Sequence, residues 1–280
     1  MSPTGGLAVV IPARNESDRI SATVRAAARI PGVDVVVVVD DGSADGTAAE
    51  AAAAGAVVAR HARNRGKAAA METGAQAVEA IEAREAAAAA AACSQPAAAG
   101  AGSHTAATGV PEPARRPRHL LFLDADLADT AEQAWPLAEP VLAGVADMTI
   151  AVFSSRVKRG GHGLVLGLSG AGVQRATGWR PAEPLNGQRC LTRAAFEAAR
   201  PLAAGWGAET GLTIDVLRNG MRVVEVQVPL AHRATGKDLA AQLHRARQFV
   251  GVARALAARQ PWRQAARGPD AQPAGRADVA

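Results

Sequence analysis

The sequence predicts an α/β domain built on a mostly parallel central sheet that helices flank. Three observations lead to this prediction. Short β-branched runs alternate with helix-length stretches in the order strand, helix, strand, helix, which is the rhythm of parallel sheets with right-handed crossovers. The strand-like runs are almost wholly apolar, as is typical of strands buried on both faces. Polar residues follow these runs directly, so ligands would meet the carboxyl ends of the strands.

The first third of the chain contains three such strand and helix pairs. Apolar β-branched runs define the strands, and apolar stripes at helical spacing define the helices. Asn15 or Ser17 can cap the first helix. Gly55 suits the position after the second helix, where a left-handed backbone is common. We expect strands at Gly6–Ile11, Val33–Val39 and Ala56–Ala59, and helices from Asp18, from Thr47 to Gly55 and at Ala68–Ala83.

Residues Arg84–Pro117 form a different kind of segment. They are rich in alanine and then in Gly, Ser, Thr and Pro, and they show no apolar periodicity beyond alanine. We interpret the segment as a frayed helix end followed by a disordered surface insertion; a partner-docking arm is the alternative. The polar end of the chain at 260–280 is interpreted as a disordered tail, which leaves one domain at 1–259.

The second half of the chain continues the α/β pattern less regularly. Asn186-Gly187 is a strong turn signal. The closing helix carries arginines on one face and an apolar stripe on the other. This stripe would pack on the domain or on a second subunit, and a membrane surface is the alternative. Its residues are Leu239, Leu243, Ala246, Phe249 or Val250, Ala253 and Leu256. We expect helices at Thr130–Leu142, Ala194–Arg200 and from Gly205 to Leu217, strands at Asp147–Val152 and Val223–Val228, and a mobile basic segment at Arg156–Gly172.

Composition narrows the classes of function. The chain has 280 residues, a net charge of +5 and a pI near 10.1, so an anionic ligand is plausible. Aromatic residues make up only 3% of the chain and tyrosine is absent, which argues against nucleic-acid binding. Cys93 and Cys190 form no metal or redox spacing, so we expect a reducing cytoplasm. We expect neither a signal peptide nor a membrane-spanning segment.

Two carboxylates follow the most apolar strand-like run. Leu120–Leu123 leads directly into Asp124-Ala125-Asp126. Alternation along a strand would place both aspartates on one side. Mg²⁺ or Mn²⁺ takes few protein carboxylates and completes its shell with phosphates and water, so this pair suits a cation that carries a diphosphate. A bare D-x-D is a weak signal by itself, and the rest of the chain must support it.

Four motifs in order resemble the family 2-type nucleotide-sugar glycosyltransferases. They are VVIPARNE at Val9–Glu16, VVDDGSADGT at Val38–Thr47, the turn Asn64-Arg65-Gly66-Lys67, and LDADL at Leu123–Leu127. Later segments look like the glucosyl-3-phosphoglycerate synthases and their relatives: PLNGQRCLTRAAF at Pro184–Phe196, GWGAETGLTIDVL at Gly205–Leu217, and His232-Arg233. The resemblance implies the Rossmann-like GT-A fold, a UDP-glucose donor and a Mg²⁺ or Mn²⁺ cofactor.

The resemblance also implies the donor-binding residues. Asp40 or Asp41 can accept the N3–H of a uracil, although a turn-forming role competes with this interpretation. Lys67 follows a glycine and can neutralise phosphate. Asn15 and Glu16 can hold the nucleoside or only cap a helix. The implied nucleotide-sugar contacts are Pro12, Ala13, Arg14, Asn15, Glu16, Asp40, Asp41, Lys67, Asp124, Ala125 and Asp126.

Catalytic and metal-binding roles follow from the same resemblance. Asp126, Glu209 and Lys67 are the implied catalytic residues. Glu209 lies in the first turn of a helix, where the helix dipole favours an anion whatever its role. Asp124, Asp126 and His232 are the implied metal ligands, and an imidazole would shift the preference toward Mn²⁺.

The acceptor is the part that the resemblance defines least. Gly187, Arg189 and Arg233 are the expected acceptor contacts, and Arg193 is expected on the same side. Arginine forks suit phosphate or carboxylate, which predicts a small anionic acceptor; solvated helix-flank arginines are the alternative. The sequence therefore predicts a cytoplasmic, metal-dependent hexosyltransferase and allows a homodimer. A polyprenyl-phosphate sugar transferase and a nucleotide-sugar-binding protein without transfer are the competing interpretations.

Overall fold

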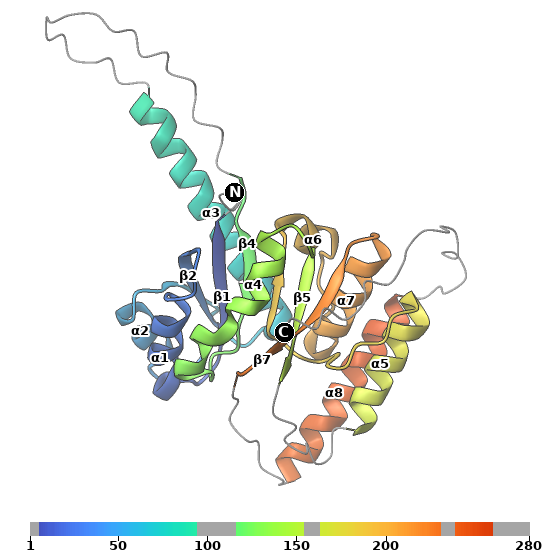
Figure 1. The fold of residues 1–280 in the computed structure, drawn as a ribbon. Helices are drawn as coiled ribbons and strands as arrows, with labels where there is room; N and C mark the ends of the chain where they lie inside the picture. The colour runs from blue at the N-terminus through green and yellow to red at the C-terminus, as the bar shows by residue number, and fades with distance from the viewer. Residues whose placement is uncertain (1–5, 94–115, 154–162, 231–238, 260–280) are drawn as a thin grey trace, which may run out of the picture.

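One mixed sheet forms the centre of the molecule. A computed structural model describes residues 6–93, 116–153, 163–230 and 239–259 (Figure 1). Within these ranges seven strands are hydrogen-bonded in the order β3-β2-β1-β4-β6-β5-β7. The strands are β1 Leu7–Ala13, β2 Val33–Asp40, β3 Val57–Arg60, β4 His119–Phe122, β5 Met148–Phe153, β6 Arg189–Leu191 and β7 Val223–Val228. Only β6 runs antiparallel to its described neighbours, β4 and β5. The predicted mostly parallel sheet is confirmed.

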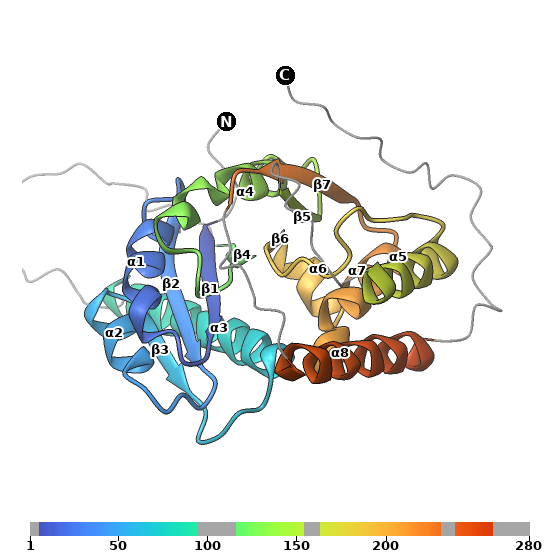
Figure 2. The same cartoon turned by 90° about the horizontal axis from the view of Figure 1, so that it is seen from below.

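Helices cover both faces of the sheet because successive side chains of its inner strands are apolar and point to opposite faces. Leu7, Val9 and Ile11 pack under the helices of one face, while Ala8 and Val10 pack under those of the other. Figure 2 shows the sheet between these layers. The first face carries α1 Ser17–Ala27, α2 Thr47–Ala53, the 3₁₀ helix η1 Ala128–Ala134 and α4 Trp135–Leu142; the second carries α3 Lys67–Cys93, α6 Arg193–Ala198 and α7 Ala208–Arg218.

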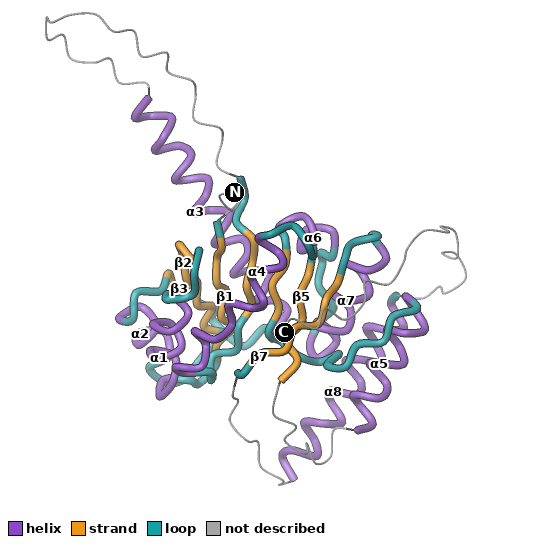
Figure 3. Tube along the Cα trace, in the orientation of Figure 1, coloured by secondary structure: helices purple, strands orange, loops and turns teal. Residues whose placement is uncertain are grey.

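A third apolar cluster attaches two more helices to α7. It joins Val165 and Val173 of α5 Gly163–Thr177, Ile214 of α7, and Val252 and Leu256 of α8 Leu239–Ala258. Figure 3 shows α5 and α8 beside α7, away from α1 and α2. None of the described helices is both long and apolar enough to cross a membrane.

Helix α3 packs very closely on the sheet at Gly74. A Cβ atom at this glycine would collide with Cγ1 of Val10 in β1 and would lie 3.3 Å from Cγ2 of Val39 in β2. The missing side chain therefore lets the helix backbone approach β1 and β2, whose carboxyl ends carry two of the polar turns. Farther along, residues 83–92 are exposed, and this end of α3 extends away from the sheet (Figure 1).

The structure corrects several predicted boundaries. The third crossover helix does not fray at Ala83 but continues to Cys93, because alanine, glutamate and arginine are strong helix formers even where nothing is buried. Residues 94–115 and 260–280 lie outside the described residues. Of the predicted mobile segment Arg156–Gly172, the part from Gly163 is helix α5, and Val165 and Val173 anchor that helix in the third apolar cluster.

Two further corrections concern strand and helix ends. Strand β1 continues through Pro12 to Ala13, and Asp41 N donates to Ala13 O at 2.9 Å, so proline does not stop it. No side-chain hydrogen bond caps α1, whose N-cap residue is Glu16. In α8, Phe249 and Val250 are 45% and 46% exposed, whereas Val252, Ala255 and Leu256 are buried, so the packed stripe is displaced from the predicted one.

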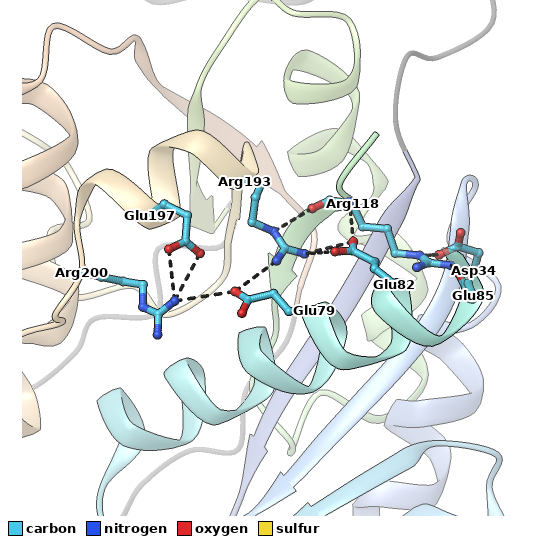
Figure 4. A network of polar contacts seen from close by, with 8 residues as sticks. All are labelled: Asp34, Glu79, Glu82, Glu85, Arg118, Arg193, Glu197 and Arg200. Carbon is cyan, nitrogen blue, oxygen red and sulfur yellow. Dashed lines mark hydrogen bonds and ion pairs between the residues drawn. The ribbon is translucent and has the colours of Figure 1, made fainter. Parts of the chain in front are cut away.

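Arginine and carboxylate side chains form a network at the amino edge of the sheet (Figure 4). Arg118, directly before β4, donates through Nε to Asp34 Oδ1 at 2.7 Å and through Nη2 to Glu85 at 2.9 Å. Arg193 bonds to Glu82 at 3.1 Å and to the carbonyl of Arg118 at 3.3 Å. Arg193 thus lies at the edge opposite the carboxyl end of β4, and its expected place beside the acceptor is wrong.

Candidate functional site

Most of the predicted site residues gather at one edge of the sheet. Strands β1, β2 and β4 are parallel and all end there. Because β6 runs antiparallel to β4, the loop that precedes β6, with Asn186 and Gly187, reaches the same edge. The fold therefore brings together segments that are more than a hundred residues apart in the sequence.

Lys67 is the centre of a charged cluster at this edge. Its Nζ donates to Oδ1 of Asp124 at 2.7 Å and lies 3.3 Å from Oε1 of Glu209. The lysine begins α3, Asp124 follows β4, and Glu209 is in the first turn of α7. Burial alone would lower the pKa of Lys67, but the charges and hydrogen bonds of Asp124 and Glu209 outweigh burial and raise it above its ordinary value. The ammonium is therefore charged at neutral pH.

Gly187 leaves the room that Lys67 occupies. A Cβ atom at this position would collide with Nζ of Lys67 and would lie 3.1 Å from Oδ1 of Asp124. The predicted acceptor-side glycine is thus in direct contact with the donor-side lysine and aspartate, which spacing in the sequence could not reveal.

The two aspartates of the D-x-D motif, Asp124 and Asp126, lie in the turn that follows β4, beyond its last residue Phe122. Strand alternation therefore does not set their directions; helix α1 holds the turn instead. Thr23, fully buried, donates through Oγ1 to Ala125 O at 2.8 Å and accepts from Ala128 N at 2.8 Å. Arg19 Nη1 donates to Asp126 O at 3.1 Å. Asp124 and Asp126 are both partly exposed.

The donor set at this turn fits a divalent cation that takes few protein ligands. Asp124 and Asp126 offer hard carboxylate oxygens on one turn, and Mg²⁺ or Mn²⁺ commonly completes such a pair with phosphates and water. Asp124 shares one oxygen with Lys67. The described ranges contain no group of three or more metal-ligating side chains. His232 and Arg233 lie outside the described residues, so their expected places are not described.

The predicted uracil-binding aspartates have different surroundings. Asp41 Oδ1 accepts from Arg65 N at 2.7 Å and lies 2.7 Å from Nδ1 of His61, while Oδ2 accepts from Gly66 N at 2.8 Å. Burial would raise the pKa of Asp41, but these hydrogen bonds and the charge of His61 lower it overall. Asp41 thus fixes the turn that leads to Lys67.

Asp40 keeps one oxygen without a hydrogen bond. Its Oδ1 accepts from Ser43 N at 2.9 Å. Its buried Oδ2 lies 3.0 Å from Nε of Arg60, an ion pair without hydrogen-bond geometry, and Arg60 has a side chain 61% exposed. Of the two aspartates, only Asp40 therefore has a side-chain oxygen without a hydrogen bond.

Asn15 joins the first two strand-end loops. Its backbone φ is +55°, its N–H donates to Ser43 Oγ at 2.9 Å, and its Oδ1 accepts from Ala44 N at 2.9 Å. Pro12 and Ala13 end β1 beside this junction, Arg14 is exposed, and Glu16 N donates to Thr47 Oγ1 at 2.9 Å. The predicted donor segment is one rigid unit with the DDGS turn.

Arg189 is not on the surface where an acceptor could reach it. Its side chain is fully buried and donates to the carbonyls of Pro184, Asn186 and Glu209 and to Thr213 Oγ1. Its expected direct contact with the acceptor is wrong, because alternation along β6 turns this side chain toward α7.

Sequence reasoning missed several residues that shape the site. His61, buried between Asp41 and Oγ1 of Thr73 at 2.9 Å, came from a basic run with no distinguishing pattern. Thr23 appeared only as a helical residue between two positions of the apolar stripe. Such roles depend on contacts across the fold, and no local signal could have indicated them.

Comparison with known proteins agrees with this description. A family model for glycosyl transferase family 2 matches residues 8–80. No curated protein matches the chain in a sequence search. Glucosyl-3-phosphoglycerate synthase from Mycobacterium tuberculosis, in complex with Mg²⁺ and UDP, is similar with a TM-score of 0.64 and 22% identity, over 91% of this chain and 79% of that one. The same enzyme with Mn²⁺, UDP and glucosyl-3-phosphoglycerate has a TM-score of 0.61 and 23% identity, over 91% and 80%.

A second kind of synthase shares the fold. Mannosyl-3-phosphoglycerate synthase from Rubrobacter xylanophilus is similar with a TM-score of 0.62 and 23% identity, over 95% of this chain and 78% of that one. These findings confirm the predicted resemblance and the Rossmann-like GT-A fold, and the family match supports the prediction of a glycosyltransferase. Residues 8–80 thus match the glycosyl transferase family 2 model, and the chain has the GT-A fold of these synthases.

Proposed function

We propose that this protein is a metal-dependent hexosyltransferase that transfers a sugar, glucose from UDP-glucose in the first instance, to a small anionic acceptor such as a phosphorylated acid. The observation that carries the proposal is the Lys67 cluster. The ammonium of Lys67, which lies within the segment that the family model matches, is placed between Asp124 and Glu209 at the carboxyl edge of the sheet.

Lys67 would stabilise the leaving group. When a nucleotide sugar gives up its hexose, negative charge builds on the departing nucleoside diphosphate. A preorganised ammonium stabilises that charge more strongly than water does. The raised pKa of Lys67 keeps it protonated, and its 29% exposed side chain leaves access for phosphate.

Glu209 would act on the sugar side of the same lysine. Its carboxylate is 5% exposed and is held at the start of α7. From there it could bind sugar hydroxyls or take the proton of the attacking acceptor hydroxyl, and either role requires that it stay fixed relative to Lys67.

Asp126 and Asp124 would hold the cation, with His232 as the proposed third ligand. A bound Mg²⁺ or Mn²⁺ would supply further positive charge to the diphosphate. The neighbouring structures of the Mycobacterium tuberculosis enzyme contain Mn²⁺ or Mg²⁺ together with UDP, which supports this assignment.

The nucleoside would lie against the loops that follow β1 and β2. We assign the uracil N3–H to Asp40 Oδ2, the buried oxygen that lacks a hydrogen bond, with the exposed Arg60 giving way. Asp41 instead supports the turn before Lys67. Pro12, Ala13, Arg14, Asn15 and Glu16 would line the same side.

The acceptor would approach from the Gly187 side, with Arg233 as a proposed anion contact. The proposal of an anionic acceptor now rests on Lys67, on Arg233 and on the phosphoglycerate that the neighbouring enzymes bind, since Arg189 and Arg193 are engaged elsewhere. We also propose a cytoplasmic location, where nucleotide sugars and a reduced Cys190 are expected.

A mass-spectrometric screen tests the proposal. UDP-sugars are incubated with phosphorylated small acids in Mn²⁺, in Mg²⁺ or with a chelator. We expect a hexosylated product that depends on the metal. Donor binding without transfer or hydrolysis would instead indicate a nucleotide-sugar-binding protein, and flotation with anionic liposomes carrying polyprenyl phosphate tests the lipid-acceptor alternative.

A further inference from the structure

Arg189 is a charged side chain with no exposed surface. Nε donates to Asn186 O at 2.7 Å, Nη1 to Glu209 O at 3.0 Å and to Thr213 Oγ1 at 2.7 Å, and Nη2 to Pro184 O at 3.1 Å. All four acceptors are neutral oxygen atoms. The guanidinium is therefore used for the geometry of its donors rather than to balance a bonded carboxylate.

The four acceptors belong to the two walls that enclose Lys67. Pro184 and Asn186 lie in the loop that ends at Gly187, whose missing side chain makes room for Nζ of Lys67. Glu209 and Thr213 lie in α7, and the Glu209 carboxylate is 3.3 Å from the same Nζ. One side chain on β6 thus joins the glycine wall to the carboxylate wall.

Thr213 strengthens this connection on the α7 side. Its hydroxyl accepts from Arg189 Nη1 and donates to Glu209 O at 2.8 Å, so the carbonyl of Glu209 receives two hydrogen bonds. On the loop side, Asn186 donates through Nδ2 to Ala151 O at 2.7 Å and accepts from Gln188 N at 3.0 Å. Both walls are therefore ordered where Arg189 binds them.

The buried charge is not fully offset by its surroundings. Burial lowers the pKa of Arg189 to about 10, and the charges of Glu209 and Glu225 counter that effect only in part. A well-packed apolar residue often stabilises a core more than a buried ion does. Stability alone therefore gives no reason for an arginine here. The reason is geometric, because the guanidinium can donate to the Gly187 loop and to α7 at the same time.

We propose that Arg189 is a positioning residue that sets the spacing between Gly187 and Glu209 and thereby aims the Lys67 ammonium at its ligand. The proposal deepens the proposed function and rests on it. Because the donor loops at Asn15 and Asp40 are held by separate contacts, losing Arg189 should reduce turnover much more than nucleotide affinity.

The first test compares Arg189→Met with Arg193→Met. Methionine keeps much of the side-chain volume and removes the fork. Arg193 is the matched control, since it is 12% exposed and binds Glu79, Glu82 and the Arg118 carbonyl at the opposite edge. For Arg189→Met we expect kcat to fall roughly 10- to 100-fold, with the Kd for UDP in Mn²⁺ changed less than threefold. For Arg193→Met we expect lower thermal stability and a kcat within twofold of wild type.

A spectroscopic readout makes the test independent of activity. The chain has three lysines, Lys67, Lys158 and Lys237. Labelling lysine with ¹³C gives a simple spectrum, in which Lys67→Arg identifies the Cε resonance of Lys67. At one neutral pH, we expect this resonance to move in Arg189→Met and to stay in place in Arg193→Met.

A milder pair of variants covers the case in which Arg189→Met does not fold. Thr213→Val removes the hydroxyl between Arg189 and the Glu209 carbonyl. Thr210→Val is its control on the same helix, because the Thr210 hydroxyl pairs with Ser169 Oγ at 2.6 Å. We expect Thr213→Val to lower kcat severalfold and to shift the Lys67 resonance, and Thr210→Val to leave that resonance in place.

The outcomes separate the two proposals. An unmoved Lys67 resonance in both Thr213→Val and any folded Arg189→Met would overturn the positioning role, whatever the activity. If the Lys67 resonance moves in these variants while the wild-type protein neither transfers nor hydrolyses any UDP-sugar, the positioning role stands and the proposed function is rejected.

Discussion

The start and the middle of helix α3 use charge in opposite ways. At its first residue, Lys67 lies between Asp124 and Glu209, and the lysine and Asp124 side chains are each 29% exposed. In the middle of the helix, Glu79, Glu82 and Glu85 bind Arg118 and Arg193, whose side chains are only 5% and 12% exposed (Figure 4). The first cluster remains accessible to a ligand, whereas the second fastens the helix to the sheet.

A cluster of ion pairs therefore does not by itself indicate a functional site. The amino-edge network has more charged groups, yet its arginines donate to carboxylates and carbonyls of the protein itself. The carboxyl-edge cluster is smaller, and the missing side chain of Gly187 makes the room that the end of Lys67 occupies. The place of the cation at the strand ends, rather than the number of charges, distinguishes the two clusters.

The largest effect is expected from Asp126→Ala. If Asp126 holds the cation, its loss removes several kcal/mol of charge stabilisation, which is roughly 10³-fold or more in turnover. Calorimetry with UDP-glucose in Mn²⁺ should show weakened binding, while the melting temperature stays near that of wild type. Unchanged metal-dependent affinity would contradict the metal assignment.

Lys67→Met is expected to have the second largest effect on turnover. Losing one preorganised cation at a leaving group lowers kcat by about 10²- to 10³-fold. The fold should persist, because the side chain is partly exposed and methionine keeps the apolar stem. Steady-state kinetics measure the effect. A kcat within threefold of wild type would show that the Lys67 ammonium does not stabilise the leaving group.

Gly187→Ala tests the space beside the lysine. The added Cβ must displace Nζ of Lys67, which is the flexible end of its side chain, so we expect kcat to fall roughly 10- to 100-fold with little loss of stability. The control is Gly167→Ala in α5, where an added Cβ meets no atom within 4 Å. Gly55 is unsuitable as a control because its φ of +99° would strain any alanine. Equal kinetics for both alanine variants would show that Lys67 tolerates the shift.

Arg118→Met tests the cluster at the middle of α3. Removing a nearly buried guanidinium that binds Asp34 and Glu85 should lower the free energy of unfolding by about 1–3 kcal/mol. Denaturant titration measures that loss, and kcat should change less than twofold. A kcat loss as large as that of Lys67→Met would mean that the two clusters are coupled.

The smallest effect is expected from deleting residues 94–115 with a short glycine linker. Their composition lacks a periodic apolar face, so the melting temperature should change by no more than about 2 °C. A deletion that begins at Arg84 is the contrast, because it removes Glu85 and its bonds to Arg118. If the shorter deletion lowers the melting temperature as much as the longer one, the segment contributes to packing.

The sequence by itself determined the architecture and the donor side of the candidate site. Valine-rich runs such as Val33–Val39 favour strands of a buried sheet, and the polar residues after them are then expected at strand ends. Four ordered motifs were enough to predict the GT-A fold, because each lies at a strand end or a helix start and their order follows the alternation of strands and helices.

Only the tertiary structure decided which charged residues face a ligand. Arg189 and Arg193 are four residues apart and chemically identical, yet one is a buried fork against α7 and the other binds α3 at the opposite edge. Likewise, Asp40 and Asp41 are adjacent, but only Asp40 keeps an oxygen without a hydrogen bond. The surroundings of the two arginines come from β6 running antiparallel, and those of the two aspartates come from the end of β3 and the segment that joins it to α3. Such long-range contacts leave no local pattern in the chain.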